Sequence, residues 1–360
     1  QDIEVAADSV LSFGVVLDRE ADSLYLGGGT PSTLSSDQLA RIFDGVRQNF
    51  RLQPASEIAV ECAPGTLSSE ITNALVACGV NRVSLGVQSF IDKEAASVGR
   101  LHTQAQTLAD IHQLRVAGIE NINVDLIAGL PHQSAASRRE SLQQVVDIGV
   151  PHVSVYILEI DEDSRLGREF IAGGTKYHAH HVPDADLAAD LYVDAIEFLE
   201  RNGIRQYEIS NFAREGCESK HNLKYWTRQP YIGFGLDAHS LLPAQDSQAD
   251  AAVALRLATT DHLDQFLRGP QQPEITPVSK TNALEEAMFL GLRLNAGIDL
   301  SKMAQQNGLD PAREFADQIK ELLQLGLVEQ SGSRLRLTQR GRLLSNEVFE
   351  RFIATSAAPH

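Results

Sequence analysis

Short β-branched runs alternate with longer amphipathic stretches along the first two thirds of the chain. The stretches repeat apolar residues at helical spacing, and a Ser or Thr before them and a Gly after them, as at Ser68 and Gly79, mark helix boundaries. This alternation predicts βαβ units and an α/β fold with a parallel sheet, either a barrel or a doubly wound sheet. The six predicted strands are SLYL (23–26), EIAVE (57–61), RVSLGVQ (82–88), NINVDLI (121–127), HVSVYILE (152–159) and RQYEIS (205–210).

The pattern changes near residue 270. The Pro-rich stretch GPQQPEITP (269–277) predicts a linker, and helical patterns at 282–294, 300–307 and 311–325 follow it. We therefore expect two domains, 1–269 and 270–360. The end of the chain predicts strand, turn at Ser331-Gly332, strand and helix, which resembles the wing of a winged helix, and a packing role is the simpler interpretation of this domain.

Composition restricts the functional class. Lys and Arg total 31 against 48 Asp and Glu, so the net charge of −17 disfavours nucleic acids and anionic membranes as partners. No apolar run approaches the roughly 20 residues of a membrane span. Three widely spaced cysteines offer no disulfide framework and fit a cytoplasmic protein.

A glycine or a polar residue marks the end of each predicted strand. Parallel α/β sheets place their active sites at the carboxyl ends of the strands, so these residues indicate one ligand-binding face. They are Gly27-Gly28-Gly29-Thr30, Glu61, Gln88, Asp125, Glu159 and Glu208.

The chemistry of these residues suits a zwitterionic nucleoside. Consecutive glycines let a ligand approach the backbone, although a tight turn explains glycines alone equally well, and neither a P-loop nor a dinucleotide fingerprint is present. Glu61 and Asp125 could receive an amino group or ribose hydroxyls. Gln88 and Arg100 could hold a polar group and a carboxylate.

Several strings resemble a known family: LYLGGGTPSTLS, ECAPGTL, NRVSLGVQSF, VGRLHT, NINVDLIAGLP, HVSVYILE, YEISNFAREG, HNLKYW and YIGFGLDAHS. They are similar to radical S-adenosylmethionine (SAM) proteins related to oxygen-independent coproporphyrinogen III dehydrogenase, in particular to their haem chaperone branch. The likeness runs in order from about Ser23 to the C-terminus. It implies a partial (β/α) TIM-like barrel and a smaller, mainly helical C-terminal accessory domain.

The resemblance also implies a set of ligand contacts. The family usually has Glu-x-Asn-Pro where this chain has Glu61-Cys62-Ala63-Pro64, so a hydrogen bond from that Asn amide is absent, which affects the loop more than Glu61. Carried over position by position, the residues that bind SAM are Gly28, Gly29, Thr30, Glu61, Gln88, Arg100 and Asp125.

The family's iron–sulfur motif is absent from this sequence. Family members carry CxxxCxxC on the first barrel strand, about 40 residues before the glycine motif, and its thiolates hold a 4Fe-4S cluster. Only 26 residues precede Gly27, none of them cysteine, and Cys62, Cys78 and Cys217 are too scattered to replace the motif. The start at Gln1 favours a truncated copy over a cluster-free relative. We expect a barrel without its first strand, no 4Fe-4S cluster on this chain and no catalytic competence as given.

The HNLKYW string, which contains the only tryptophan, is the haem-associated motif of the chaperone branch. Histidine ligates haem iron, and aromatic rings can cover the macrocycle, although a structural aromatic cluster is the general alternative. The resemblance implies that His221 is an axial ligand and that Asn222, Tyr225 and Trp226 shape the haem site.

Other polar groups give weaker indications. His178, His180 and His181 suggest a metal site, but a surface loop is the simpler interpretation. The acidic run 161–163 predicts a solvated loop, and His239 is a candidate to line the barrel mouth.

Two functions follow from the resemblance. The first is a carrier that binds haem and delivers it to apo-haem proteins such as respiratory cytochromes, with SAM and the cluster in a supporting role. The alternative is radical SAM oxidative decarboxylation of coproporphyrinogen III. The missing cluster motif favours the carrier for this chain, and the sequence leaves dimerisation open.

Overall fold

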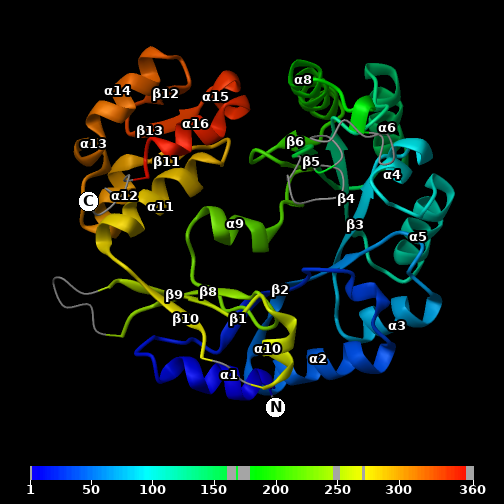
Figure 1. The fold of residues 1–360 in the computed structure, drawn as a ribbon, viewed down its shortest axis with the longest axis horizontal. Helices are drawn as coiled ribbons and strands as arrows, with labels where there is room; N and C mark the ends of the chain where they lie inside the picture. Colours follow the sequence, from blue (N-terminus) through cyan, green and yellow to red (C-terminus); the bar gives the residue numbers. More distant parts are fainter. Residues whose placement is uncertain (1, 160–167, 169–178, 246–251, 270–271, 354–360) are drawn as a thin grey trace. The chain divides into compact units, whose positions relative to one another are not determined.

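The protein, described by a computed structural model at residues 2–159, 168, 179–245, 252–269 and 272–353, divides into two compact units (Figure 1). The barrel unit consists of Asp22–Phe43 and Pro54–Ser219. The α9 unit consists of Gln1–Ala21, Asp44–Gln53 and Lys220–His360. The two units consist of several chain segments each, whereas the expected domains, 1–269 and 270–360, are continuous. The boundary at residue 270 stays a prediction.

A seven-stranded sheet forms the centre of the barrel unit, in the order β1-β2-β3-β4-β5-β7-β6. Strands β2 to β5 are parallel, whereas β7 is antiparallel to β5, and β6 is antiparallel to β7. The sheet and its helices confirm the predicted α/β class with a partial (β/α) barrel. The strands are β1 (Glu20–Leu26), β2 (Arg51–Cys62), β3 (Arg82–Gln88), β4 (Asn121–Ala128), β5 (His152–Ile157), β6 (Arg205–Gln206) and β7 (Asn211–Ala213).

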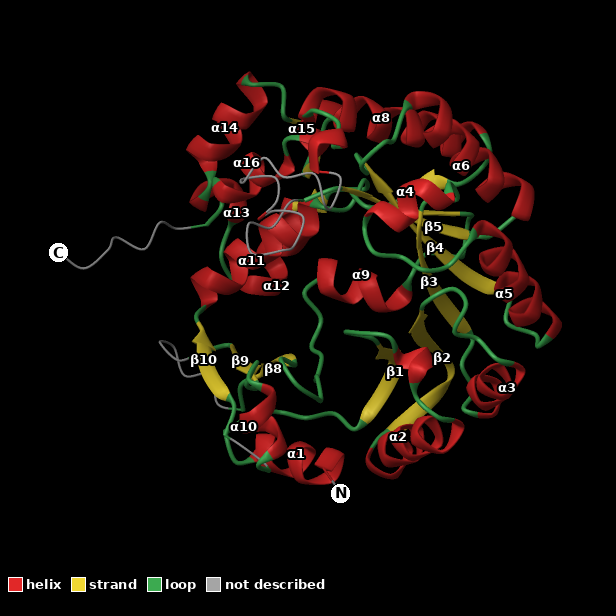
Figure 2. Cartoon of the chain, turned by 45° about the vertical axis from the view of Figure 1, so that its right-hand side comes forward, coloured by secondary structure: helices red, strands yellow, loops and turns green. Residues whose placement is uncertain are grey.

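Helices follow the parallel strands, and α3, α5, α6 and α8 lie along one face of the sheet (Figure 2). The predicted helix start at Ser68 is confirmed, because its side chain accepts a hydrogen bond from a backbone amide of the first turn of α3. Thr103 and Asp184 cap α5 and α8 in the same way. The helices are α2 (Ser36–Asn49), α3 (Ser69–Ala77), α4 (Asp92–Ser97), α5 (Gln104–Val116), α6 (Ala135–Ile148) and α8 (Ala185–Arg201), with the short η1 (Pro31–Thr33) and η2 (Ala179–His181).

The sixth predicted strand, 205–210, is confirmed only at Arg205–Gln206, and the rest of that prediction is wrong. β6 has two residues, and the chain reverses after it, so β7 returns antiparallel to β6. Glu208 lies in this reversal, 0% exposed, and accepts hydrogen bonds from the amide of Ser210 (3.0 Å) and from Nδ2 of Asn211 (2.5 Å). Its carboxylate accepts hydrogen bonds within the reversal, and Glu208 does not end a parallel strand.

The α9 unit begins with α1 (Asp2–Leu11) and contains a three-stranded antiparallel sheet of β8 (His239–Pro243), β9 (Ala254–Ala258) and β10 (Glu274–Val278). Val10 and Val15 near the N-terminus share a buried cluster with Leu242 and Leu257 of the sheet. The predicted linker 269–277 is partly a strand, because β10 begins at Glu274. β10 is an edge strand, where Pro277 needs no N–H for the sheet ladder, so a Pro-rich sequence can still pair there.

The rest of the α9 unit is mainly helical and confirms the predicted strand–turn–strand wing. β12 (Val328–Ser331) and β13 (Arg334–Leu337) pair antiparallel, with β11 (Ile298–Asp299) on the other side of β13. No helix of the described residues is long and apolar enough to cross a bilayer. The helices are α9 (Lys220–Trp226), α10 (Leu263–Leu267), α11 (Lys280–Leu292), α12 (Leu300–Asn307), α13 (Pro311–Glu314), α14 (Ala316–Gln324), α15 (Gln339–Leu343) and α16 (Ser345–Glu350).

Candidate functional site

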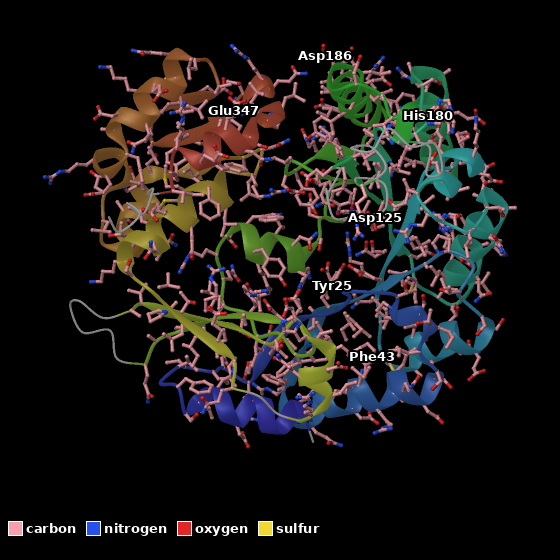
Figure 3. All side chains as sticks on the ribbon, viewed as in Figure 1. Tyr25, Phe43, Asp125, His180, Asp186 and Glu347 are labelled. Atoms are coloured by element: carbon pink, nitrogen blue, oxygen red, sulfur yellow. The ribbon has the colours of Figure 1, made fainter. Side chains whose placement is uncertain are left out.

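Polar side chains line the face of the barrel sheet opposite to α3, α5 and α6. Alternate residues of a strand point to opposite faces. On β4, Asn123 and Asp125 alternate with Val124 and Leu126, which are both 0% exposed. Tyr25 and Asp125 lie on the polar face (Figure 3). This face collects the candidate ligand-binding residues of the barrel unit.

The three glycines after β1 have different surroundings. A Cβ added to Gly27 would lie 2.5 Å from Cε1 of Tyr25 and 2.8 Å from Cδ of Glu61. A Cβ added to Gly28 or Gly29 would meet nothing within 4 Å, and Gly28 has a positive φ of 88°. Gly27 is therefore required for packing, whereas the backbone of Gly28 and Gly29 borders open space.

Glu61, at the end of β2, faces this glycine loop. Oη of Tyr25 donates to Oε1 of Glu61 at 2.5 Å, and the amide of Gly28 donates to Oε2 at 3.1 Å. Burial, followed by the nearby charge of Glu61, raises the pKa of Tyr25, so the phenol keeps its proton and remains a donor. The two hydrogen bonds fix the carboxylate beside the backbone of the loop.

Asp125, on β4, is held by neighbouring hydroxyl and amide groups. Oγ of Ser84 donates to Oδ2 at 3.0 Å, and Nδ2 of Asn123 donates to Oδ1 at 2.7 Å. Desolvation raises the pKa of Asp125, and hydrogen bonds from Ser154, Ser84 and Asn123 oppose this effect only in part. The carboxylate is therefore oriented, but its charge is costly to keep in the barrel interior.

The amide of Asn123 is itself oriented from β5. Nδ1 of His152 lies 2.6 Å from Oδ1 of Asn123, and Nε2 of His152 lies 2.9 Å from Oη of Tyr207. Burial lowers the pKa of His152 well below its ordinary value, and the charge of Arg82 lowers it further. A neutral imidazole that donates from Nδ1 and accepts at Nε2 satisfies both contacts.

Gln88 and Arg100 gather over Gly86 on β3. A Cβ at Gly86 would lie 3.3 Å from Nε2 of Gln88 and 3.9 Å from Nη2 of Arg100. Gln88 is 7% exposed and adopts a left-handed φ of 66°, where the register between β3 and β4 shifts. The structure thus brings an amide and a guanidinium together near the end of β3.

The predicted SAM residues of the barrel unit converge in part. Glu61 is the register partner of Ser84, which bonds Asp125, so the two carboxylates lie near one another. Thr30 contributes its carbonyl to the start of η1, where it accepts from the amide of Thr33 at 3.0 Å. Glu159 follows β5 and is exposed. Binding of SAM by these residues stays a prediction.

The HNLKYW motif forms α9. Nε2 of His221 lies 3.1 Å from Oη of Tyr225 one turn later, and the two rings pack edge to face with centroids 5.1 Å apart. Tyr225 packs in the same way on Tyr231, with centroids 4.8 Å apart. Burial raises the pKa of both tyrosines, so their phenols stay neutral. Asn222, also partly buried, lies one residue after His221.

Trp226 fastens the end of α9 to the C-terminal helices. The guanidinium of Arg293 lies over its indole ring, 4.1 Å from the ring centroid. Two further arginines near this end, Arg228 and Arg256, share the carboxylate of Glu286 on α11, at 2.7 and 2.6 Å. One face of the indole is thus covered by protein, and its predicted part in a haem site stays a prediction.

The described histidines form ring contacts with one another. The rings of His180 and His181 have centroids 4.0 Å apart, and His132, which follows β4, stacks on His181 at 4.0 Å. Within the described part of the chain, no three His, Cys, Asp or Glu side chains are placed to hold a metal ion. His178 and the acidic run 161–163 lie outside the described residues. His239 lies at the start of β8 in the α9 unit.

Several supporting residues escape an inspection of strand ends alone. These residues precede the strand ends, and their side chains lie on the same face of the sheet as the candidate ligand-binding residues. They are Tyr25, Ser84, Asn123, His152 and Ser154. Their signal is a polar residue at every second position, as in NINVD, within otherwise buried strands. A single face that is polar along its whole length could have been predicted from that alternation.

Comparisons with known proteins decide the family. The pattern of the Radical SAM superfamily matches residues 9–145, and that of the HemN C-terminal domain matches residues 278–344. The heme chaperone HemW of Bacillus subtilis is 35% identical over 336 residues, which is 92% of this chain and 85% of that protein. The chain belongs to the HemW family of radical SAM proteins.

Other relatives agree with this family. The heme chaperone HemW of Escherichia coli is 30% identical, with 93% of this chain and 85% of that protein covered. A bovine mitochondrial protein, radical S-adenosyl methionine domain-containing protein 1, is 32% identical, with 90% and 73% covered. The solved coproporphyrinogen III oxidase HemN of E. coli has a TM-score of 0.78 at 24% identity, covering 93% of this chain and 78% of that one. HemN therefore shares the fold.

The residues present fit one implied cofactor and not the other. The open backbone at Gly28 and Gly29, beside the oriented carboxylate of Glu61, suits the zwitterionic end of SAM. A 4Fe-4S cluster does not fit the three cysteines. Burial raises the pKa of Cys62 to about 12, so it remains a thiol, and Cys62, Cys78 and Cys217 form no ligand group among the described residues.

Proposed function

We propose that this chain is a haem carrier that binds haem through α9 and passes it to apo-haem proteins. The observation that carries this proposal is the row His221, Tyr225, Tyr231 on and after α9, in a chain 35% identical to a protein named heme chaperone HemW. Histidine is a common axial ligand of haem iron, and aromatic rings pack against the macrocycle. Respiratory cytochromes are one class of acceptor that fits, and the cytoplasm is the compartment that fits three free cysteines.

His221 is the residue we assign to the iron. Its Nε2 contacts the phenol of Tyr225 at 3.1 Å, and that phenol is kept protonated by burial. Iron ligation at Nε2 would replace this contact, and Tyr225 would then be released to pack on or bond the ligand. Asn222 directly follows His221 and Trp226 directly follows Tyr225, and together they complete the segment we assign to haem.

The barrel unit is the part we assign to SAM. Glu61 and Asp125 would take the ammonium group and the ribose hydroxyls, Arg100 the carboxylate and Gln88 a polar group, over the backbone of Gly28, Gly29 and Thr30. When SAM is bound beside a reduced 4Fe-4S cluster, it supplies a 5′-deoxyadenosyl radical. This chain has no thiolate set for that cluster, so SAM has a supporting part here and no radical step is assigned.

The alternative is oxidative decarboxylation of coproporphyrinogen III. Its support is the structural similarity to HemN, and at 24% identity this similarity indicates a shared fold and not a shared reaction. We therefore retain the carrier.

A haem titration of the purified chain, followed by absorbance, tests the proposal. We expect saturable binding of one haem per chain, weakened about tenfold or more by His221→Ala because the axial bond is lost. His262→Ala is the matched control, because His262 is an exposed histidine of the same unit, with 70% of its side chain accessible. Equal weak binding by wild type and His221→Ala would refute the assignment of α9.

A further inference from the structure

We infer that Tyr25 is a positioning residue, whose phenol holds the carboxylate of Glu61 beside Gly28 so that it can receive the ammonium group of an aminoacyl nucleoside. This inference rests on the proposed SAM site. It adds to that site Tyr25 of β1, which acts through its hydrogen bond to Glu61.

The geometry is a two-point clamp. Tyr25 donates to Oε1 of Glu61 at 2.5 Å, and the Gly28 amide donates to Oε2 at 3.1 Å, so each oxygen receives one hydrogen bond. A carboxylate oxygen can accept two, so each oxygen retains a lone pair for a ligand. The clamp removes most of the rotational freedom of the Glu61 side chain before any ligand arrives.

The backbone is shaped around this pair. A side chain at residue 27 would collide with both partners, at 2.5 Å from Tyr25 and 2.8 Å from Glu61, whereas residues 28 and 29 have open space where a side chain would be. The first glycine therefore accommodates the Tyr25–Glu61 pair, and the other two leave room for the ligand. Because Gly28 also donates to Glu61, the clamped carboxylate lies at the end of the site that the glycine backbone borders.

Tyr25 acts as a neutral donor in this arrangement. Burial raises its pKa first, and the charges of Glu61 and Asp125 raise it further, so phenolate is disfavoured and proton transfer from Tyr25 is not expected. The protonated phenol therefore remains available to donate to Oε1 of Glu61. Loss of the phenol leaves the carboxylate in place but mobile.

The test is calorimetric titration of the full chain with two probes. S-adenosylhomocysteine carries the ammonium group, and its analogue without the amino group does not. We expect Tyr25→Phe to weaken binding of S-adenosylhomocysteine roughly 3- to 10-fold, as for one lost hydrogen bond, and to change binding of the deamino analogue less than about twofold. Glu61→Gln should give the same selective loss, more strongly.

Tyr192→Phe is the matched control, because Tyr192 is a buried tyrosine of the barrel unit that bonds Ile209 and Gln206, not Glu61. It should bind both probes as wild type does. If Tyr25→Phe binds both probes like wild type, or weakens both equally, the positioning role is overturned while the SAM site stands. If wild type binds neither probe, the SAM site itself fails. Should Tyr25→Phe fold poorly by its melting curve, Gly27→Ala, which displaces the same pair, must show the same selectivity.

Discussion

Nδ1 of His152 on β5 lies 2.6 Å from Oδ1 of Asn123 on β4, and this contact determines which way the Asn123 amide points. With its oxygen directed at the imidazole, the amide nitrogen of Asn123 is left to donate to Asp125, at 2.7 Å. Tyr207 holds the other ring nitrogen of His152 at 2.9 Å. The neutral His152 thus orients the carboxylate of Asp125, a candidate ligand-binding group, through the amide of Asn123.

Acid should destabilise the protein partly through His152. Its folded pKa is depressed, so below the ordinary value of 6.5 the unfolded chain binds a proton that the folded chain does not. The stability it contributes is present above that pH and is lost as the pH falls, at about 1.4 kcal/mol per pH unit. Urea unfolding of wild type and His152→Asn at pH 7 and pH 5 measures this loss. The variant, whose amide can still donate to Asn123, should lose less, and an identical loss in both proteins would contradict the depressed pKa.

Asp125→Asn should stabilise the folded chain at neutral pH. The pKa of Asp125 is raised in the folded chain. The stability that protonated Asp125 contributes to the folded chain is therefore present below the unfolded pKa of 3.8, and it is lost as the pH rises through the folded pKa. The neutral amide escapes that loss and can still accept from Asn123. We expect the melting temperature at pH 7 to rise by about 1 to 3 °C, the gain to vanish near pH 3, and binding of S-adenosylhomocysteine to weaken. A variant that melts lower at pH 7 would contradict the costly charge.

Two glycines of one loop should respond differently to alanine. Gly28 has a φ of 88°, so Gly28→Ala forces a left-handed alanine and should cost about 1 kcal/mol of stability or more. Gly29 has no such φ and borders open space, so Gly29→Ala should melt within about 1 °C of wild type. Its methyl group would occupy the space we assign to the ligand and weaken S-adenosylhomocysteine binding. Unchanged binding by Gly29→Ala would show that the ligand lies elsewhere.

Trp226 should matter for stability more than for haem. Arg293 covers one face of its indole at 4.1 Å, a contact worth about 0.5 to 2 kcal/mol. Trp226→Phe weakens this contact and should lower the melting temperature by a few degrees, while haem affinity falls less than in His221→Ala. Thermal melts and haem titrations of the two variants decide this. A Trp226→Phe variant that melts normally but loses haem would show that the indole serves haem binding and not stability.

The strands and most helix starts could be predicted because their signals are local. The string RVSLGVQ predicts β3 residue for residue, and the hydroxyl of Thr103 caps α5 as its position suggests. The family also follows from motifs that occur in the expected order along the chain. What the sequence could not supply was strand direction at 205–210, because a buried Glu208 that closes a reversal has the same local pattern as a strand end.

The residues of the candidate site at the strand ends could be predicted, whereas the residues that orient them could not. The glycine loop and Glu61 are recognisable because they follow β-branched runs, whereas the dependence of Glu61 on Tyr25 is a contact between residues 36 positions apart. The Pro-rich segment 269–277 was misleading for a similar reason. Whether Pro277 can lie in a strand depends on its being at a sheet edge, which only the tertiary structure determines.

The central claim is tested most directly by transfer of haem. The haem-loaded chain is mixed with increasing concentrations of a haem-free b-type cytochrome, and the Soret band is followed over time. A carrier predicts complete transfer at a rate that rises with acceptor concentration, and a loss of transfer from His221→Ala because that variant loads poorly. No transfer, or a slow rate that is the same at every acceptor concentration, would show that haem merely dissociates and would contradict the account.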